Sequence, residues 1–174
     1  NLTSSFTAKH SILQDQDKLS LFDYFYKKFN SQYSAFLPGP VYDILSYSPE
    51  LFLEKSGPSI LTQPIKGTLR SNEINDLILS EKESSELSMI VDLLRNDLQQ
   101  ICVYPVVVSQ HRAQMNLNYT THTYSEIKGT TEKSLPEIIK MMSPGGSISG
   151  CPKKESLKAI NELESNQRHF YTGS

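Results

Sequence analysis

A lysine in the run PIKGT, Lys66, precedes a helical stretch that carries Glu83 and Glu86. A lysine acts as a nucleophile or base where its surroundings lower its pKa. Two carboxylates three positions apart on a helix project from one face, and Mg²⁺ commonly binds through one or two such groups while substrate and water fill its other positions. A solvated helix face produces the same charge run. The spacing therefore indicates either a magnesium site or an ordinary polar surface.

Glu50 and His122 are further candidates for acid–base chemistry. Glu50 precedes an apolar stretch in SPELF, so burial of the strand end would raise the pKa of its carboxyl group and make it a proton donor. An ordinary glutamate in a turn fits the same pattern. His122 lies in the alternating segment TTHTYSEI, where it can face either a site or solvent.

The glycine-rich run PGGSISG contains Gly145, Gly146 and Ser147 at the entrance to a predicted helix. Backbone amides at such an entrance bind anions, so the run indicates a site for a carboxylate or phosphate. It lacks the lysine and the serine or threonine that complete a nucleotide-binding loop, which argues against a nucleotide. The alternative is a flexible turn that only caps the helix.

The hydrophobic pattern predicts an α+β fold in which most strands follow one another along the chain. Apolar residues at helical spacing predict helices at residues 19–29, about 75–98, 134–142 and about 152–163. Short apolar stretches predict strands at residues 34–37, 42–48, 51–54, 59–68, 102–110 and 118–129, the fifth being an edge or bulged strand because of Pro105. Ser134 is expected to cap the third helix, and Leu157, Ile160 and Leu163 are expected to face inward from the last.

Composition sets limits on the function. The 174 residues are 37% hydrophobic and 21% charged, as in one globular domain or a piece of one. A net charge of -2 without a basic stripe argues against a nucleic-acid partner. The absence of a long apolar run or a signal-peptide pattern predicts a cytoplasmic protein with no membrane partner. The last residues, YTGS, look like the approach to another strand, so an incomplete domain is expected.

The order of five motifs resembles the chorismate-utilising enzymes over essentially the whole chain. These motifs are SPELF, PIKGT, SEKESSELSMIVDLLRND, THTYSEIKG and PGGSISGCPKK. The resemblance implies an α+β domain with the four-layer α/β/β/α sandwich of the anthranilate synthase component I family. Residues 1–174 would form a partial chorismate-binding catalytic domain that lacks the N-terminal and C-terminal portions of the family domain. It also implies chorismate as substrate and Mg²⁺ as cofactor.

The resemblance assigns catalytic and metal-binding roles to four residues. Lys66 corresponds to a lysine that attacks C2 of chorismate, with loss of the C4 hydroxyl group and later addition of ammonia at C4. Glu50 corresponds to the general acid near the departing hydroxyl. Glu86 corresponds to a ligand of Mg²⁺, and Glu83 lies in or beside the metal shell.

The resemblance also implies a set of substrate contacts. His122 corresponds to a histidine near the substrate ring, and Thr68 to a hydroxyl that contacts the substrate. Gly145, Gly146 and Ser147 correspond to a loop that borders the carboxylate pocket. The family continues past YTGS with an arginine for a chorismate carboxylate and a further glutamate for Mg²⁺, neither of which is in this sequence.

Lys66 favours one branch of the family. The anthranilate synthases usually carry alanine at this position, so the sequence resembles the aminodeoxychorismate synthases of para-aminobenzoate and folate synthesis. This branch aminates chorismate at C4 with ammonia from a glutamine amidotransferase subunit. The alternatives are an anthranilate synthase component I, a water-using isochorismate or salicylate synthase, or a catalytically incomplete fragment that acts at most as a docking module for the glutaminase.

Overall fold

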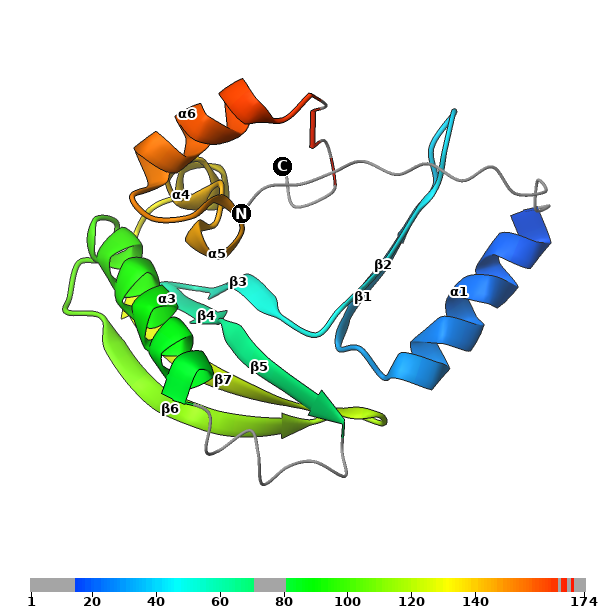
Figure 1. The fold of residues 1–174 in the computed structure, drawn as a ribbon, viewed down its shortest axis with the longest axis horizontal. Helices are drawn as coiled ribbons and strands as arrows, with labels where there is room; N and C mark the ends of the chain where they lie inside the picture. The colour runs from blue at the N-terminus through cyan, green and yellow to red at the C-terminus, as the bar shows by residue number, and fades with distance from the viewer. Residues whose placement is uncertain (1–14, 71–80, 166, 169, 171–174) are drawn as a thin grey trace.

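A computed structural model describes residues 15–70, 81–165, 167–168 and 170 (Figure 1). The helices are α1 (Asp15–Phe29), α3 (Glu81–Gln99), α4 (Leu135–Met142), α5 (Gly146–Ser149) and α6 (Lys153–Leu163). The strands are β1 (Tyr33–Leu37), β2 (Ile44–Ser48), β3 (Leu51–Ser56), β4 (Ser59–Gln63), β5 (Ile65–Arg70), β6 (Val107–Asn116) and β7 (Thr120–Thr130). The predicted α+β class is confirmed, with all described strand pairs antiparallel. The four-layer sandwich stays a prediction.

Strand β7 is the centre of the larger, five-stranded sheet. Strands β4 and β5 both pair with one edge of β7, and β6 pairs with the other edge. Strand β3 pairs with β4. The single strand predicted for residues 59–68 is therefore wrong, because Pro64 divides it into two. Proline has no N–H to donate to the ladder, and the Pro64 carbonyl instead accepts a hydrogen bond of 3.1 Å from the Ser125 amide.

The start of β6 also differs from the prediction. The strand begins at Val107 and not near Cys102, and it extends to Asn116. Pro105 prevents regular pairing of the preceding residues, as expected for a proline beside a strand. The predicted bulging is present, since the register with β7 shifts twice between Val108 and Ala113.

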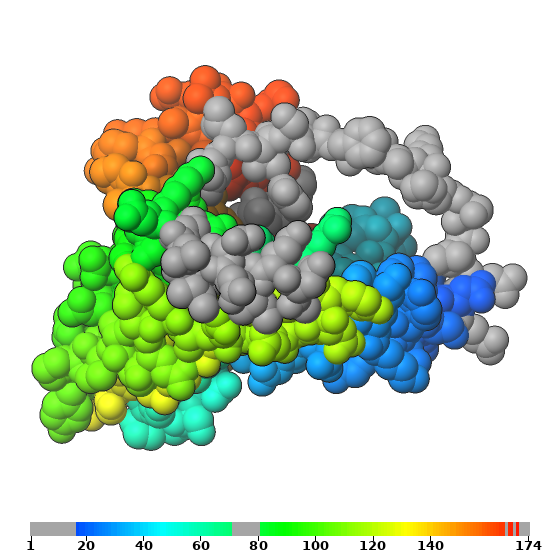
Figure 2. Space-filling model, turned by 60° about the horizontal axis from the view of Figure 1, so that its bottom comes forward, coloured from blue at the N-terminus to red at the C-terminus, as the bar shows by residue number. Residues whose placement is uncertain are grey.

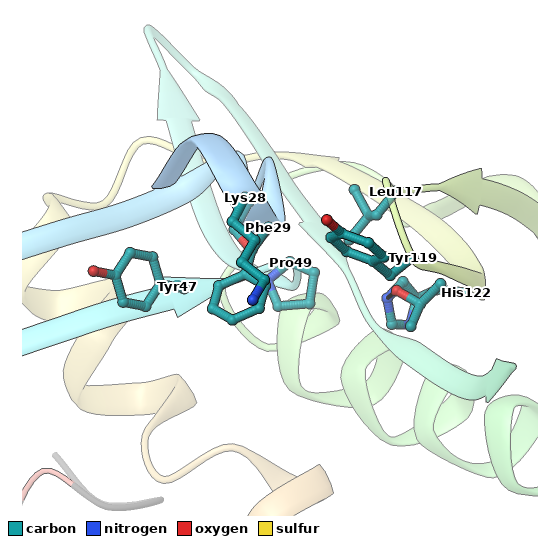
Figure 3. A pocket seen from close by; sticks show the side chains of 9 residues that line it. Lys28, Phe29, Tyr47, Pro49, Leu117, Tyr119 and His122 are labelled. Carbon is teal, nitrogen blue, oxygen red and sulfur yellow. Dashed lines mark hydrogen bonds between the residues drawn. The ribbon is translucent and has the colours of Figure 1, made fainter. Parts of the chain in front are cut away.

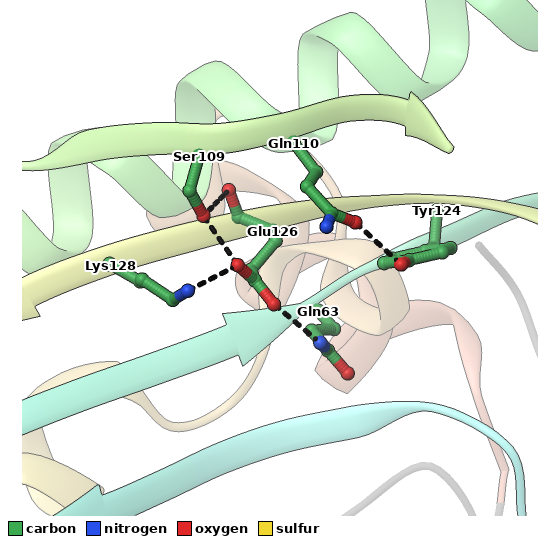
Figure 4. A network of polar contacts seen from close by, with 6 residues as sticks. All are labelled: Gln63, Ser109, Gln110, Tyr124, Glu126 and Lys128. Carbon is green, nitrogen blue, oxygen red and sulfur yellow. Dashed lines mark hydrogen bonds and ion pairs between the residues drawn. The ribbon is translucent and has the colours of Figure 1, made fainter. Parts of the chain in front are cut away.

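A polar network joins three strands of this sheet (Figure 4). The Glu126 carboxylate on β7 accepts hydrogen bonds from Gln63 on β4, at 2.9 Å, and from Ser109 on β6, and it forms an ion pair with Lys128. The Lys128 and Ser109 contacts hold the pKa of Glu126 below its ordinary value. The network links side chains of β4, β6 and β7.

Helix α3 packs on the larger sheet with one apolar stripe, as predicted. Its buried residues are Leu87, Ile90, Val91, Leu94 and Leu98, and they form a core with Ile60 and Ile127 of the sheet. Burial of each such side chain contributes about 1.5–3 kcal/mol relative to exposure. The predicted start of this helix, at residues 75–80, lies outside the described residues.

Helix α1 and the β1–β2 hairpin form a second unit beside the sheet (Figure 1). The aromatic rings of Phe22, Phe25 and Phe29 surround Tyr47 of β2, with centroid distances of 5.3, 5.9 and 5.8 Å. The end of α1 meets the β6–β7 turn, where the Asn118 side-chain amide donates to the Lys28 carbonyl at 3.0 Å (Figure 2). The unit is thus fixed to the main sheet near the start of β7.

Ser134 caps α4, as predicted, and the Glu137 carboxylate accepts hydrogen bonds from both its amide and its hydroxyl. The prediction of an inward-facing stripe on α6 is only partly correct. Ile160 is half-buried, but Leu157 and Leu163 are 37% and 66% exposed, and none of the residues of α6 is fully buried. None of the helices in the described ranges combines the length and apolar character needed to cross a bilayer.

Candidate active site

Strand β5 presents Lys66 and Thr68 on either side of a glycine. Gly67 has φ of 81°, in the left-handed region that favours glycine, and the register with β7 shifts at this point. As a result Lys66 lies opposite Thr123 and Thr68 lies opposite His122. The glycine of PIKGT therefore sets the positions of both predicted site residues.

Glu50 lies beside the start of β5, although it belongs to the connection between β2 and β3. Its Oε1 accepts a hydrogen bond of 3.4 Å from the Ile65 amide, and its own amide donates to Ser48 Oγ at 3.3 Å. Burial raises the pKa of the Glu50 carboxyl group above its ordinary value, against the opposing effects of the Ile65 amide and the positive charge of Lys66. The structure thus brings the two predicted catalytic residues together.

His122 is buried on β7 and bonded at both ring nitrogens. Nδ1 lies 2.8 Å from Thr68 Oγ1, and Nε2 lies 3.0 Å from Thr120 Oγ1. Burial lowers the pKa of His122 below its ordinary value of 6.5, so the ring is neutral at physiological pH. Thr68 and His122, predicted separately as substrate contacts, are therefore one hydrogen-bonded pair.

A cavity of about 480 Å³ opens beside His122 (Figure 3). Its wall combines His122 and Thr120 of β7 with Tyr119 and Leu117 of the preceding turn. The opposite wall comes from the smaller unit, through Phe29, Tyr47 and Pro49. The cavity is mostly apolar, and the polar side chains of Lys28 and Ser31 line it together with His122.

A second cleft, of about 390 Å³, joins Glu50 to the glycine-rich run. Gly145 and Ser147 line it together with Glu50 and Phe52. Gly146 does not line the cleft but is buried against Leu93 of α3, where a side-chain carbon would lie 1.8 Å from Leu93 Cδ2. The predicted anion loop therefore faces the predicted general acid, and close packing on α3 holds it in place.

The far side of the same loop is held by charged residues. Arg168 donates to the Ile148 carbonyl at 2.9 Å and pairs through two nitrogens with the Glu164 carboxylate. Lys153, just after the loop, pairs with Asp97 of α3 at 2.7 Å. These contacts fix the loop between α3 and the end of the described chain.

Glu83 and Glu86 lie in the first two turns of α3, ahead of the buried stripe. Both side chains are half-buried. They therefore do not lie on a fully solvated helix face, which was the alternative interpretation of this run of charges. Within the described ranges, no group of three His, Cys, Asp or Glu side chains is placed to hold a metal ion. Two carboxylates fit the oxygen donors that Mg²⁺ takes from a protein, provided that substrate and water complete the shell.

Sequence reasoning missed Thr120, Ser48 and the apolar wall of the cavity beside His122. Thr120 lies two positions before His122, a spacing that puts both side chains on one face of a strand. That spacing was available from the sequence. The contribution of Tyr47 and Phe29 was not, because it depends on how α1 docks against the β6–β7 turn.

A family model described as chorismate binding enzyme matches residues 1–174. The chain belongs to this family. It is 38% identical over 155 residues to aminodeoxychorismate synthase component 1 of Bacillus subtilis, covering 83% of this chain and 33% of the relative. It is 39% identical over 153 residues to an anthranilate synthase component 1 of Haloarcula marismortui, covering 82% and 31%.

Solved structures agree with the family assignment. Anthranilate synthase component I of Streptococcus pneumoniae superposes with a TM-score of 0.76 at 29% identity, over 86% of this chain and 35% of that one. The chain thus spans about a third of the length of each of these three relatives. The two kinds of synthase are almost equally similar in sequence, so identity does not separate them.

Proposed function

We propose that this chorismate-binding enzyme aminates chorismate at C4 to give 4-amino-4-deoxychorismate, the reaction of para-aminobenzoate and folate synthesis. The observation that carries the proposal is Lys66 beside Glu50. A lysine nucleophile requires a proton donor for the group that it displaces, and a buried carboxyl group with a raised pKa is such a donor.

The two residues divide the reaction into two displacements. The Lys66 amine attacks C2 of chorismate, the ring double bonds shift, and the C4–oxygen bond breaks while Glu50 gives its proton to the departing hydroxyl, which leaves as water. Ammonia then adds at C4, the double bonds shift back, and the bond between C2 and Lys66 breaks. The ammonium group formed at C4 returns a proton to the Glu50 carboxylate. Chorismate and ammonia thus give aminodeoxychorismate and water, and the lysine is regenerated.

The remaining candidates position the substrate. Thr68, held by His122, offers a hydroxyl on the strand that also carries Lys66, while Gly145 and Ser147 border the cleft that contains Glu50. Glu86, with Glu83 in or beside the shell, would hold Mg²⁺. When bound, this ion would counter the charge of a substrate carboxylate.

Ammonia would come from a glutamine amidotransferase subunit. The support is that the relatives carry names of the form "component 1", which describe one part of a two-component synthase. The second candidate function is that of an anthranilate synthase component 1, favoured by the 39% identity to the Haloarcula marismortui protein. Lys66 in place of the alanine usual in those enzymes favours the first candidate.

The test is to incubate the full-length protein with chorismate, Mg²⁺ and ammonium and to identify the product by mass. Aminodeoxychorismate is the expected product. Anthranilate with pyruvate as the main product would overturn the proposal in favour of the second candidate.

Lys66→Ala should abolish turnover. Lys55→Ala is the matched control and should keep it, because Lys55 lies on β3 of the same sheet and its ammonium donates to the nearby Gly57 carbonyl. Full activity of Lys66→Ala would remove the lysine from the mechanism.

A further inference from the structure

His122 has a second hydrogen-bond partner, Thr120, to which the proposed reaction assigns no role. The imidazole lies between two threonine hydroxyls, with Thr68 at Nδ1 and Thr120 at Nε2. A neutral imidazole has one N–H donor and one lone pair, so one hydroxyl must accept from the ring and the other must donate to it. The orientation of one threonine hydroxyl therefore sets the orientation of the other.

The burial of His122 makes this coupling strict. The side chain is 6% exposed, and burial lowers its pKa, so the doubly protonated ring that could donate to both threonines is disfavoured. With both nitrogens engaged, the ring has no capacity left for a direct hydrogen bond to a ligand. What it can present to a ligand is the hydroxyl of Thr68, which is an exposed residue.

The strand geometry explains why Thr120 occupies this position. Residues two apart on a strand share a face, so Thr120 lies beside His122 on β7, and Thr68 is the register partner of His122 across the ladder. The intervening Thr121 is buried and donates to Asn116 Oδ1 at 2.8 Å. Two adjacent threonines thus have different partners, and only Thr120 contacts the ring.

We propose that Thr120 is a positioning residue that fixes the tautomer of His122 and thereby directs the Thr68 hydroxyl proton toward the substrate. In this arrangement the Thr120 hydroxyl donates to Nε2, and the Nδ1–H donates to Thr68 Oγ1. The Thr68 hydroxyl can then donate a hydrogen bond to an acceptor. Carboxylate oxygens are acceptors only, so this is the orientation that an anionic substrate requires.

The inference rests on the proposed function for its substrate, and the test separates the two. In the full-length protein, nitrogen NMR of labelled histidine reports the tautomer of His122 without turnover, with His122→Gln used to assign the signal. The wild-type ring should be protonated at Nδ1 alone. Thr120→Val, which keeps the side-chain shape but removes the hydroxyl, should give a mixture of tautomers, and Thr121→Val should not.

Kinetics supply the second measurement. Thr120→Val should lower kcat/KM for chorismate about ten-fold, as expected for loss of one hydrogen bond in a buried network. Thr120→Ser, which restores the hydroxyl, should recover most of this loss. Because Thr120 acts through His122 on Thr68, the double variant Thr68→Val with Thr120→Val should lose no more than Thr68→Val alone.

Three results would overturn the inference: protonation of the wild-type ring at Nε2, losses that multiply in the double variant, or equal effects of Thr120→Val and Thr121→Val. If the enzyme makes a product other than aminodeoxychorismate, the proposed function fails. The tautomer and the ratio of variant to wild-type rates can still be measured with that product.

Discussion

Replacing Gly146 by alanine tests whether the packing of the glycine-rich loop on α3 controls the cleft. A side-chain carbon at this position would lie 1.8 Å from Leu93 Cδ2 and 2.9 Å from Leu93 Cγ. Two carbon atoms in contact settle roughly 3.5–4.0 Å apart, so about 2 Å must be gained. Rotation of the Leu93 end group relieves only the first contact. The loop must therefore move away from α3, or Leu93 must leave its place.

Both the stability and the activity should respond. Overpacking of this kind costs about 1–3 kcal/mol of the free energy of unfolding. A displacement of about 1 Å in a substrate-positioning group can cost about a hundred-fold in rate, and the same loop carries Gly145 and Ser147 opposite Glu50. We expect a lower urea midpoint and a fall in kcat/KM for chorismate approaching that factor.

The neighbouring glycine is the matched control. A side-chain carbon on Gly145 would meet Phe52 at 3.4 Å, and its φ of -60° suits alanine, so Gly145→Ala should cost less than about 0.5 kcal/mol. Adding Gly146→Ala to a Leu93→Ala background should also cost little, because the opposing atoms are gone. The reasoning is refuted if Gly146→Ala costs the same in both backgrounds, or no more than Gly145→Ala.

Three other perturbations have defined outcomes. Burial raises the pKa of Glu50 above 4.5, so the folded protein retains a proton that the unfolded chain releases, and the free energy of unfolding should fall as pH rises from 4.5 through the raised value. Glu50→Gln should reduce this decline, and equal pH slopes in urea titrations would contradict it. Gly67→Ala should lower stability by about 1–2 kcal/mol because φ is 81°, and a neutral result in the same titrations would remove the strain argument. Glu86→Gln should raise the Mg²⁺ concentration for half-maximal activity at least about ten-fold, whereas exposed Glu81→Gln should leave it unchanged; equal Mg²⁺ titrations would exclude Glu86 as a ligand.

The sequence predicted helices and strands well where a single local pattern, such as apolar spacing or a capping residue, determined them. The spacing of Leu87, Ile90 and Leu94 predicts the buried stripe of α3, and Ser134 as a capping residue predicts the start of α4. The predictions were wrong where a proline interrupted an otherwise continuous strand pattern. Pro64 separates two strands that remain paired to the same partner, a break that alternation of side chains does not reveal.

The candidate site required information that no local pattern contains. Glu50 contacts the start of β5 from the connection between β2 and β3, and His122 meets Thr68 from a strand 54 positions further along the chain. The order of motifs indicated which residues belong to the site but not how they pair. The exposure of Leu157 and Leu163 on α6 was not predicted for a similar reason. Helical periodicity identifies an apolar stripe but not whether another element covers it.

The central place of β7 has a consequence for biosynthesis. Strands β4 and β5 are translated long before the strand with which they pair, since Ile60 pairs with Gly129 and Lys66 with Thr123. At about 5–20 residues per second, the ribosome takes several seconds to deliver β7 after β5. During that interval the β3–β4 hairpin has an open edge and an uncovered Ile60, whose final environment includes Ile127. The nascent chain is therefore expected to need protection from aggregation until Thr130 has left the ribosome, and the sheet then to close in a single late step.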